Sequence, residues 1–106
     1  MSVKDLGALF KQAQEMQSKI ADVQRDLAGK KIEVSTGGGM VKITANGINE
    51  ILSIHIDDEL INMNDREVLE ALIIGAMNEV HKKVKEMAQD EMSKLTGGLK
   101  IPGLFT

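Results

Sequence analysis

One short run of acidic and imidazole side chains has the chemistry of a metal site. The candidate ligands are His55, Asp57, Asp58 and Glu59. His55 and Asp57 would share one face of a strand, and an imidazole with two carboxylates could hold a divalent ion. No second group of ligands elsewhere has helpful spacing, so we interpret the run as a polar strand end followed by a charged turn. The sequence predicts neither a metal site nor any other cofactor.

No other arrangement in the sequence suits catalysis. The run Gly37-Gly38-Gly39 could suggest a phosphate loop, but the lysine and hydroxyl that such a loop needs are missing. The chain has no cysteine and no Gly-x-Ser-x-Gly elbow, and only two histidines could serve as general bases near neutral pH. We therefore predict a protein that is not an enzyme and has no small-molecule substrate.

Charge placement on a predicted long helix points to a different chemistry. At about 100° per residue, lysines and amides gather on the face opposite the apolar stripe, while three acids fall on one flank. Such a row could follow a phosphate backbone. The row consists of Asn78, Lys82, Lys85 and Gln89, and the full set of candidate DNA-binding residues is Lys4, Lys11, Lys82, Lys83 and Lys85. These residues alone leave open the alternative of an ordinary solvated surface.

Two helices are predicted to position these groups. Apolar residues three and four apart predict a helix over residues 1–28, and Gly29 stands where helices commonly end. Asn64 and Glu67 form a capping box that starts a second helix over residues 65–96. That helix would be about 48 Å long, whereas a compact domain of this size is only about 30–35 Å across. We expect the long helix to protrude or to pack against a second subunit.

The apolar seams of the two helices supply the candidate residues for the core and for a dimer contact. They are Leu9, Met16, Ile20, Val23, Ile73, Val80 and Val84. A homodimer would bring the first helix or the long helix against its counterpart.

The middle of the chain predicts a three-stranded antiparallel sheet over residues 31–56. Apolar and polar residues alternate there with the period of a strand. Asn46-Gly47 is typical of a two-residue type I′ hairpin, which would place Ala45 opposite Ile48 and Ile43 opposite Glu50. Residues 97–106 are expected to form an irregular tail. The whole chain, 1–106, is predicted to be a single α+β domain.

Composition bounds the function without naming it. The chain has 106 residues and a formal net charge of −3, which argues mildly against nucleic acid as a partner. Phe10 and Phe105 are its only aromatic residues, too few for a platform that stacks exposed bases. The sequence shows no signal peptide and no membrane-spanning run, so we expect a protein that is neither exported nor membrane-spanning.

The order and spacing of several motifs resemble the YbaB/EbfC family of bacterial nucleoid-associated proteins. The motifs are Lys-Gln-Ala-Gln-Glu-Met-Gln at 11–17, Gly-Met-Val-Lys-Ile-Thr-Ala-Asn-Gly at 39–47, Ile-His-Ile-Asp at 54–57, Ala-Met-Asn-Glu-Val at 76–80 and Met-Ser-Lys-Leu-Thr-Gly-Gly at 92–98. The resemblance implies an α-β-β-β-α subunit and a tweezer-like homodimer. It also implies a cytoplasmic protein on the nucleoid that binds DNA, alters its conformation and influences gene expression and nucleoid organisation.

Backbone contact is the mechanism that the residues favour for such a protein. Lysines on two helical arms would neutralise phosphates, and counterion release would supply most of the affinity. With two arginines in the chain, direct base readout should be weak, so we expect little sequence selectivity. The alternative is a dimeric helical scaffold that docks a protein partner through its methionines and apolar tail, without binding DNA.

Overall fold

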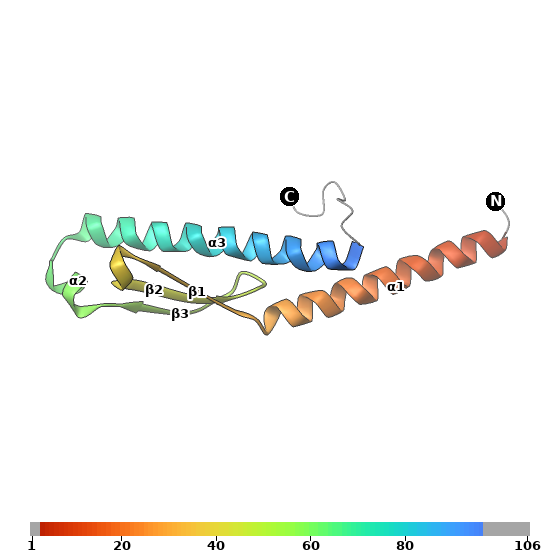
Figure 1. Ribbon diagram of the computed structural model, residues 1–106, viewed down its shortest axis with the longest axis horizontal. Coiled ribbons are helices and arrows are strands. Elements are labelled where there is room, and N and C mark those ends of the chain that lie inside the picture. The colour runs from red at the N-terminus through yellow and green to blue at the C-terminus, as the bar shows by residue number, and fades with distance from the viewer. Residues whose placement is uncertain (1–2, 97–106) are drawn as a thin grey trace.

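The computed structural model describes residues 3–96, and the side chains of residues 5–95 (Figure 1). Its elements are α1 (Val3–Ala28), β1 (Lys31–Thr36), a 3-10 turn η1 (Gly37–Gly39), β2 (Val41–Asn46), β3 (Ile51–Ile56), α2 (Asp58–Asn62) and α3 (Arg66–Thr96). The α+β class, the three strands and the long C-terminal helix are confirmed. The predicted tail over 97–106 lies outside the described residues.

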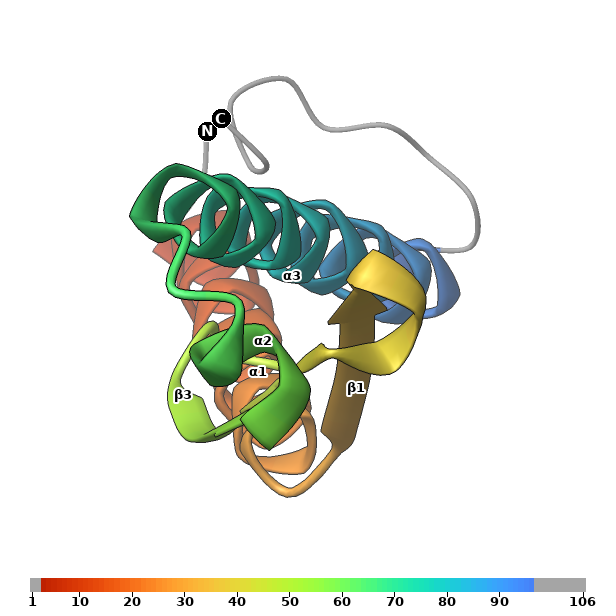
Figure 2. The same ribbon diagram turned by 90° about the vertical axis from the view of Figure 1, so that its left-hand side faces the viewer.

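The sheet is antiparallel, in the order β1-β2-β3, and α3 lies along one of its faces (Figure 2). The core forms between the two layers because β2 turns alternate apolar residues toward α3. Its members on β2 and α3 that are 0% exposed are Val41, Ile43, Ala45, Ala76 and Val80. These come from the two apolar patterns, of period 2 and about 3.6, that predicted the strand and the helix.

The element that projects is α1, whereas the length argument expected α3 either to protrude or to pack against a second subunit. The chain extends 71 Å along its longest axis, and its radius of gyration is 19.8 Å, against about 13 Å for a compact chain of this length. In Figure 1, α1 runs on past the end of α3, while α3 spends most of its length over the sheet. The long helix finds its apolar partner within its own subunit, because the sheet lies beneath it.

The predicted hairpin register between β2 and β3 was wrong. Ala45 pairs with Ile51 and Ile43 pairs with Ile54, with a bulge between them. The two strands are joined by a four-residue loop, closed by a hydrogen bond from the Asn46 amide to the Glu50 carbonyl. The Asn46 side chain explains the longer loop, because its Oδ1 accepts hydrogen bonds from the backbone amides of residues 48 and 50. Its Nδ2 donates to the Glu50 carboxylate at 2.8 Å.

Gly47 has a packing role in this loop, in place of the positive φ that a type I′ turn requires. It is not among the glycines with positive φ, whereas Asn49 of the same loop has φ 67°. A Cβ at position 47 would lie 2.5 Å from the Leu27 carbonyl oxygen, which accepts a hydrogen bond from the Gly47 amide at 2.8 Å. The loop therefore anchors the C-terminal end of α1 to the sheet, and only glycine allows this approach.

The start of α3 lies one residue later than predicted. Asp65, and not Asn64, caps the helix, since its Oδ1 accepts a hydrogen bond from the Val68 amide at 3.2 Å. Asn64 has φ 54° and makes the turn that separates α3 from α2. A left-handed residue at this point redirects the chain, so the capping position moves to the next carboxylate.

Candidate functional site

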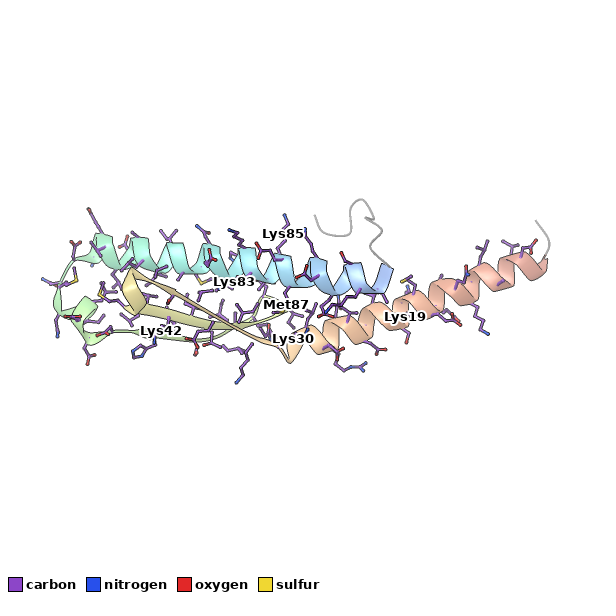
Figure 3. The ribbon with its side chains drawn as sticks, in the orientation of Figure 1. Lys19, Lys30, Lys42, Lys83, Lys85 and Met87 are labelled. Atoms are coloured by element: carbon purple, nitrogen blue, oxygen red, sulfur yellow. The ribbon has the colours of Figure 1, made fainter. Side chains whose placement is uncertain are left out.

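The outer face of α3 carries the row of polar side chains that the sequence predicted. Lys82 and Lys85 are exposed there, with Asn78 exposed beside them and Gln89 half-buried. In Figure 3 the Lys85 side chain points away from the sheet. Val80 of the same helix is fully buried against the sheet, so the opposite face of the helix points outward. From residue 78 to 89 the row is about 16 Å long, close to five base-pair steps of a DNA helix axis.

These two lysines have no ion-pair partner within the part of the chain that the structure describes. The acids Glu79, Glu86 and Asp90 line the groove on the β1 side of α3 instead. An unpaired ammonium group on an open helix face can meet a phosphate without first breaking an ion pair. The row therefore has the accessibility that a phosphate track requires.

Lys83 does not belong to that row. Its side chain lies on the side of α3 toward the sheet (Figure 3), where it lines two shallow pockets beside β1. Glu33 and Glu79 line one of these pockets, and Glu86 and Asp90 line the other. Lys83 follows Lys82 directly, so it is rotated by about 100° around the helix axis. This rotation separates it from the row and places it among carboxylates.

Two further lysines near the end of α3, Lys30 and Lys94, share one carboxylate within the protein. Glu91 accepts a hydrogen bond from the Lys30 ammonium, and Lys94 Nζ lies 3.5 Å from the same carboxylate oxygen. The hydrogen bond from Lys30 is the main reason why the pKa of Glu91 is held below its ordinary value. These cations join the start of β1 to α3, so their charges already have a partner.

Of the two candidate DNA-binding lysines on α1, the structure describes the side chain of only one. Lys11 is exposed on α1, whereas the side chain of Lys4 lies outside the described residues. Arg25 is paired with Asp22 at 3.3 Å, and both side chains are exposed. Lys11 belongs to the N-terminal half of α1. That half projects past the end of α3, so the protomer does not bring it to the α3 row (Figure 1).

Lys42 is one of several exposed cations that were absent from the sequence-based set. Lys42 lies on β2, directly opposite His55 of β3, on the face of the sheet away from α3 (Figure 3). The alternation of polar and apolar residues in β2 indicated that Lys42 is exposed, but it did not indicate that Lys42 binds a ligand. Because the sheet separates Lys42 from the α3 row, the two belong to different surfaces.

The predicted seam residues divide between the core and open surface. Val80 is fully buried, and Ile73 and Val84 pack against the core of the protomer. On α1, Ile20 and Val23 are half-buried, while Leu9 and Met16 are exposed along the projecting part. The α3 seam thus serves the protomer, and the first half of the α1 seam has no cover in the described structure.

The run at 55–59 has a structural use. Asp57 caps α2, with its Oδ1 accepting a hydrogen bond from the Glu59 amide at 3.0 Å. Among the described residues, no three acidic, histidine or cysteine side chains gather closely enough to hold a metal ion. Nor does any helix in residues 3–96 combine the length and the apolar character needed to cross a membrane.

Comparisons with known proteins agree with this geometry. The model of the YbaB/EbfC DNA-binding family matches residues 1–99. A nucleoid-associated protein of Thermoanaerobacter pseudethanolicus is 45% identical over 101 residues, covering 95% of this chain and 91% of the relative. Another from Ruminiclostridium cellulolyticum is 47% identical, covering 95% and 89%. The crystal structure of an uncharacterized Helicobacter pylori protein matches with a TM-score of 0.75 and 25% identity, covering 91% of this chain and 98% of that one.

Proposed function

Since this chain belongs to the YbaB/EbfC DNA-binding family and is a nucleoid-associated DNA-binding protein, we propose that it binds the DNA phosphate backbone as a homodimer. In this proposal it acts on the nucleoid in the cytoplasm and changes DNA conformation, with effects on gene expression and nucleoid organisation. The family is a DNA-binding one and not an enzyme family, which also favours DNA over the alternative of a scaffold that only docks a protein.

The observation that carries the proposal is the row of unpaired cations on the outer face of α3. Lys82 and Lys85 are exposed there, and the nearby acids Glu79, Glu86 and Asp90 lie on the β1-side flank of the helix. Each phosphate contact releases condensed counterions, so a few well-placed lysines bind DNA even on a chain whose net charge is −3. The distribution of charge, and not its sum, supports the function.

Weak sequence selectivity follows from the side chains available. Arg25 and Arg66 are the only arginines, and the Arg25 guanidinium is already paired with Asp22. Bidentate recognition of guanine therefore has few candidates, whereas lysines contact phosphates as point charges without reading bases. Any preference among DNA sequences is expected to come from DNA shape or deformability.

A homodimer is supported by the apolar side chains that one protomer leaves uncovered. Leu6, Leu9, Phe10 and Met16 are exposed on the projecting helix, and further apolar residues are exposed on β3. A second copy would cover part of this surface and would double the number of lysine rows. Two rows on one particle bind with a higher effective concentration than either row alone.

The salt dependence of DNA binding tests this proposal. Wild type and the double variant Lys82→Gln with Lys85→Gln are compared on two unrelated duplexes by fluorescence anisotropy from 50 to 200 mM salt. The salt slope should fall by roughly 0.9 for each phosphate that is no longer neutralised, and by twice that in a symmetric dimer. The decrease should be equal on both duplexes. Lys42→Gln, which removes an exposed lysine from the opposite surface, controls for the loss of one positive charge and should change little.

A double variant that binds with the affinity and the salt slope of wild type would overturn the α3 track. The phosphate contacts would then lie on the first helix, where Lys4 and Lys11 are the remaining candidates, or at Lys30 and Lys31.

A further inference from the structure

The apolar seam of α1 is covered at one end and open at the other. Its residues recur three or four positions apart, so they lie along one side of the helix. Leu27, near the C-terminal end, is 5% exposed, whereas Met16 is 40%, Leu9 is 51% and Leu6 is 55% exposed. We define the open seam as Leu6, Leu9, Phe10 and Met16, all of them exposed in the described chain. A contiguous apolar patch of this kind marks an interaction site on a soluble protein.

The C-terminal half of the seam is covered in part by the last turns of α3. The two helices contact each other, and Ile20 and Val23 of α1 are half-buried. Met92, near the end of α3, is 8% exposed. The helix α3 ends at Thr96, and α1 runs on past that end (Figure 1). The open seam therefore belongs to the part of α1 that α3 does not reach.

The sequence that follows α3 has apolar residues at alternate positions. Residues 97–106, which lie outside the described residues, read Gly-Gly-Leu-Lys-Ile-Pro-Gly-Leu-Phe-Thr. Pro102 disfavours a helix there and restricts the residue before it to extended conformations. In an extended segment Leu99, Ile101 and Phe105 share one face, because alternate side chains point the same way. Such a segment presents an apolar edge and has no acid.

We propose that residues 99–105 lie along the open seam of α1 in the same chain. The lengths agree, since the seam from Leu6 to Met16 is about 15 Å long and an extended segment from Leu99 to Phe105 spans about 20 Å. The segment starts three residues after the end of α3, the point at which the cover of α1 stops. A short covalent connection gives it a high effective concentration at the seam.

This contact supports the part of α1 that has the fewest neighbours. A helix segment without tertiary packing is marginal in water, so a cover on its apolar side stabilises the projecting arm. Lys11 lies about 200° around the helix from Leu9, so the cover leaves this lysine accessible. The inference is independent of DNA binding and of the homodimer proposed above, which needs only part of the exposed apolar surface. A second copy of α1 is the competing occupant of the open seam.

Backbone hydrogen exchange over residues 6–16 measures the cover. Ile101→Ser removes one apolar side chain from the segment, so these amides should exchange roughly tenfold faster than in wild type. Lys100→Ser, which changes the neighbouring residue on the opposite face of the segment, is the matched control and should leave the rates unchanged. Amides in the first half of α3 should be unaffected in both variants. Wild-type exchange rates in Ile101→Ser, or equal acceleration by the two variants, would overturn the proposal.

Cross-linking identifies the occupant, since the chain contains no cysteine and introduced thiols report only their own positions. Leu9→Cys combined with Ile101→Cys should react with a short bismaleimide to give a cross-link within one chain, seen as a monomer of altered mobility on a denaturing gel. Lys11→Cys combined with Ile101→Cys places the first thiol on the opposite side of α1 and should give much less of this product.

Covalent dimers in place of the cross-linked monomer would contradict the proposal. If they form with Leu9→Cys alone, a second copy of α1 covers the seam; if they need both thiols, the segment comes from another chain. Equal yields of the cross-linked monomer from the Leu9 and Lys11 pairs, or no cross-link from either, would also overturn the proposal. The salt slope of DNA binding is measured on separate variants, so failure of this contact leaves the lysine track to its own test.

Discussion

Lysines on opposite sides of α3 differ in their neighbours and therefore in what they can bind. Lys82 and Lys85 point away from the sheet and have no ion-pair partner in the described residues. On the sheet side, Lys94 shares the Glu91 carboxylate with Lys30 from the start of β1. The same residue type thus forms ion pairs on one side and stays available on the other. A net charge of −3 says nothing about this division.

The largest expected effect comes from replacing Val80, whose burial against the sheet determines which face of α3 points outward. Val80 is 0% exposed, so Val80→Asp places an uncompensated charge in the core and should destabilise the fold by at least about 3 kcal/mol. Thermal or urea unfolding measures the change. Ile74→Asp, whose position is 60% exposed on the same helix, is the control and should cost little. Equal effects of the two substitutions would mean that α3 is oriented differently on the sheet.

A smaller effect should follow from widening the basic face of α3. Glu86 lies in the groove on its β1 side, so Glu86→Lys removes an acid and adds a cation to the flank of the lysine row. DNA affinity should rise, by up to about tenfold at low salt, and the salt slope should become steeper. Glu15→Lys, on the projecting helix, makes the same charge change as a control. An equal gain from both variants would show that net charge, and not the α3 face, governs binding.

The smallest expected effect concerns the ion pair between Lys30 and Glu91. Lys30→Gln removes the hydrogen bond that chiefly lowers the pKa of Glu91, so that pKa should rise toward its ordinary value. A lowered folded-state pKa contributes stability above the unfolded-state value, and this stability disappears as pH falls through the folded-state pKa. The variant should therefore lose less stability than wild type over that acidic range. NMR titration of Glu91 measures the pKa, and an unchanged value would show that Lys30 is not its partner in solution.

Much of the fold was predictable because its signals are local or periodic. The apolar spacing of α1 and α3 and the alternation of β2 each determine one element and its buried face. The loop after β2 was not predictable in the same way, because Asn46 uses its side chain to close a longer loop. The requirement for glycine at position 47 comes from the Leu27 carbonyl, which is distant in the sequence. The residues around the turn therefore carry no sequence signal for this contact.

The candidate site was predictable only in part for a related reason. Helical rotation placed Lys82 and Lys85 on one face, and the structure has them there. Spacing along α3 places Lys83 beside Glu79 and Glu86, four residues before it and three after it. It does not reveal that Glu33 of β1 lies beside Lys83 as well. The exposure of Ile51, Leu52 and Ile54 on β3 was also not predictable, since apolar residues in a strand suggest that it is buried. Whether a layer covers a strand depends on how far the helix above it reaches.

The most direct test of the central claim compares the two groups of lysines in one titration of DNA binding against salt. The variants are Lys82→Gln with Lys85→Gln and Lys30→Gln with Lys94→Gln, which remove the same formal charge from opposite sides of α3. If the outer face is the phosphate track, only the first pair should lower the salt slope, by roughly 0.9 for each phosphate that each copy no longer neutralises. Equal slopes for the two variants, or a larger decrease for the second, would contradict the account.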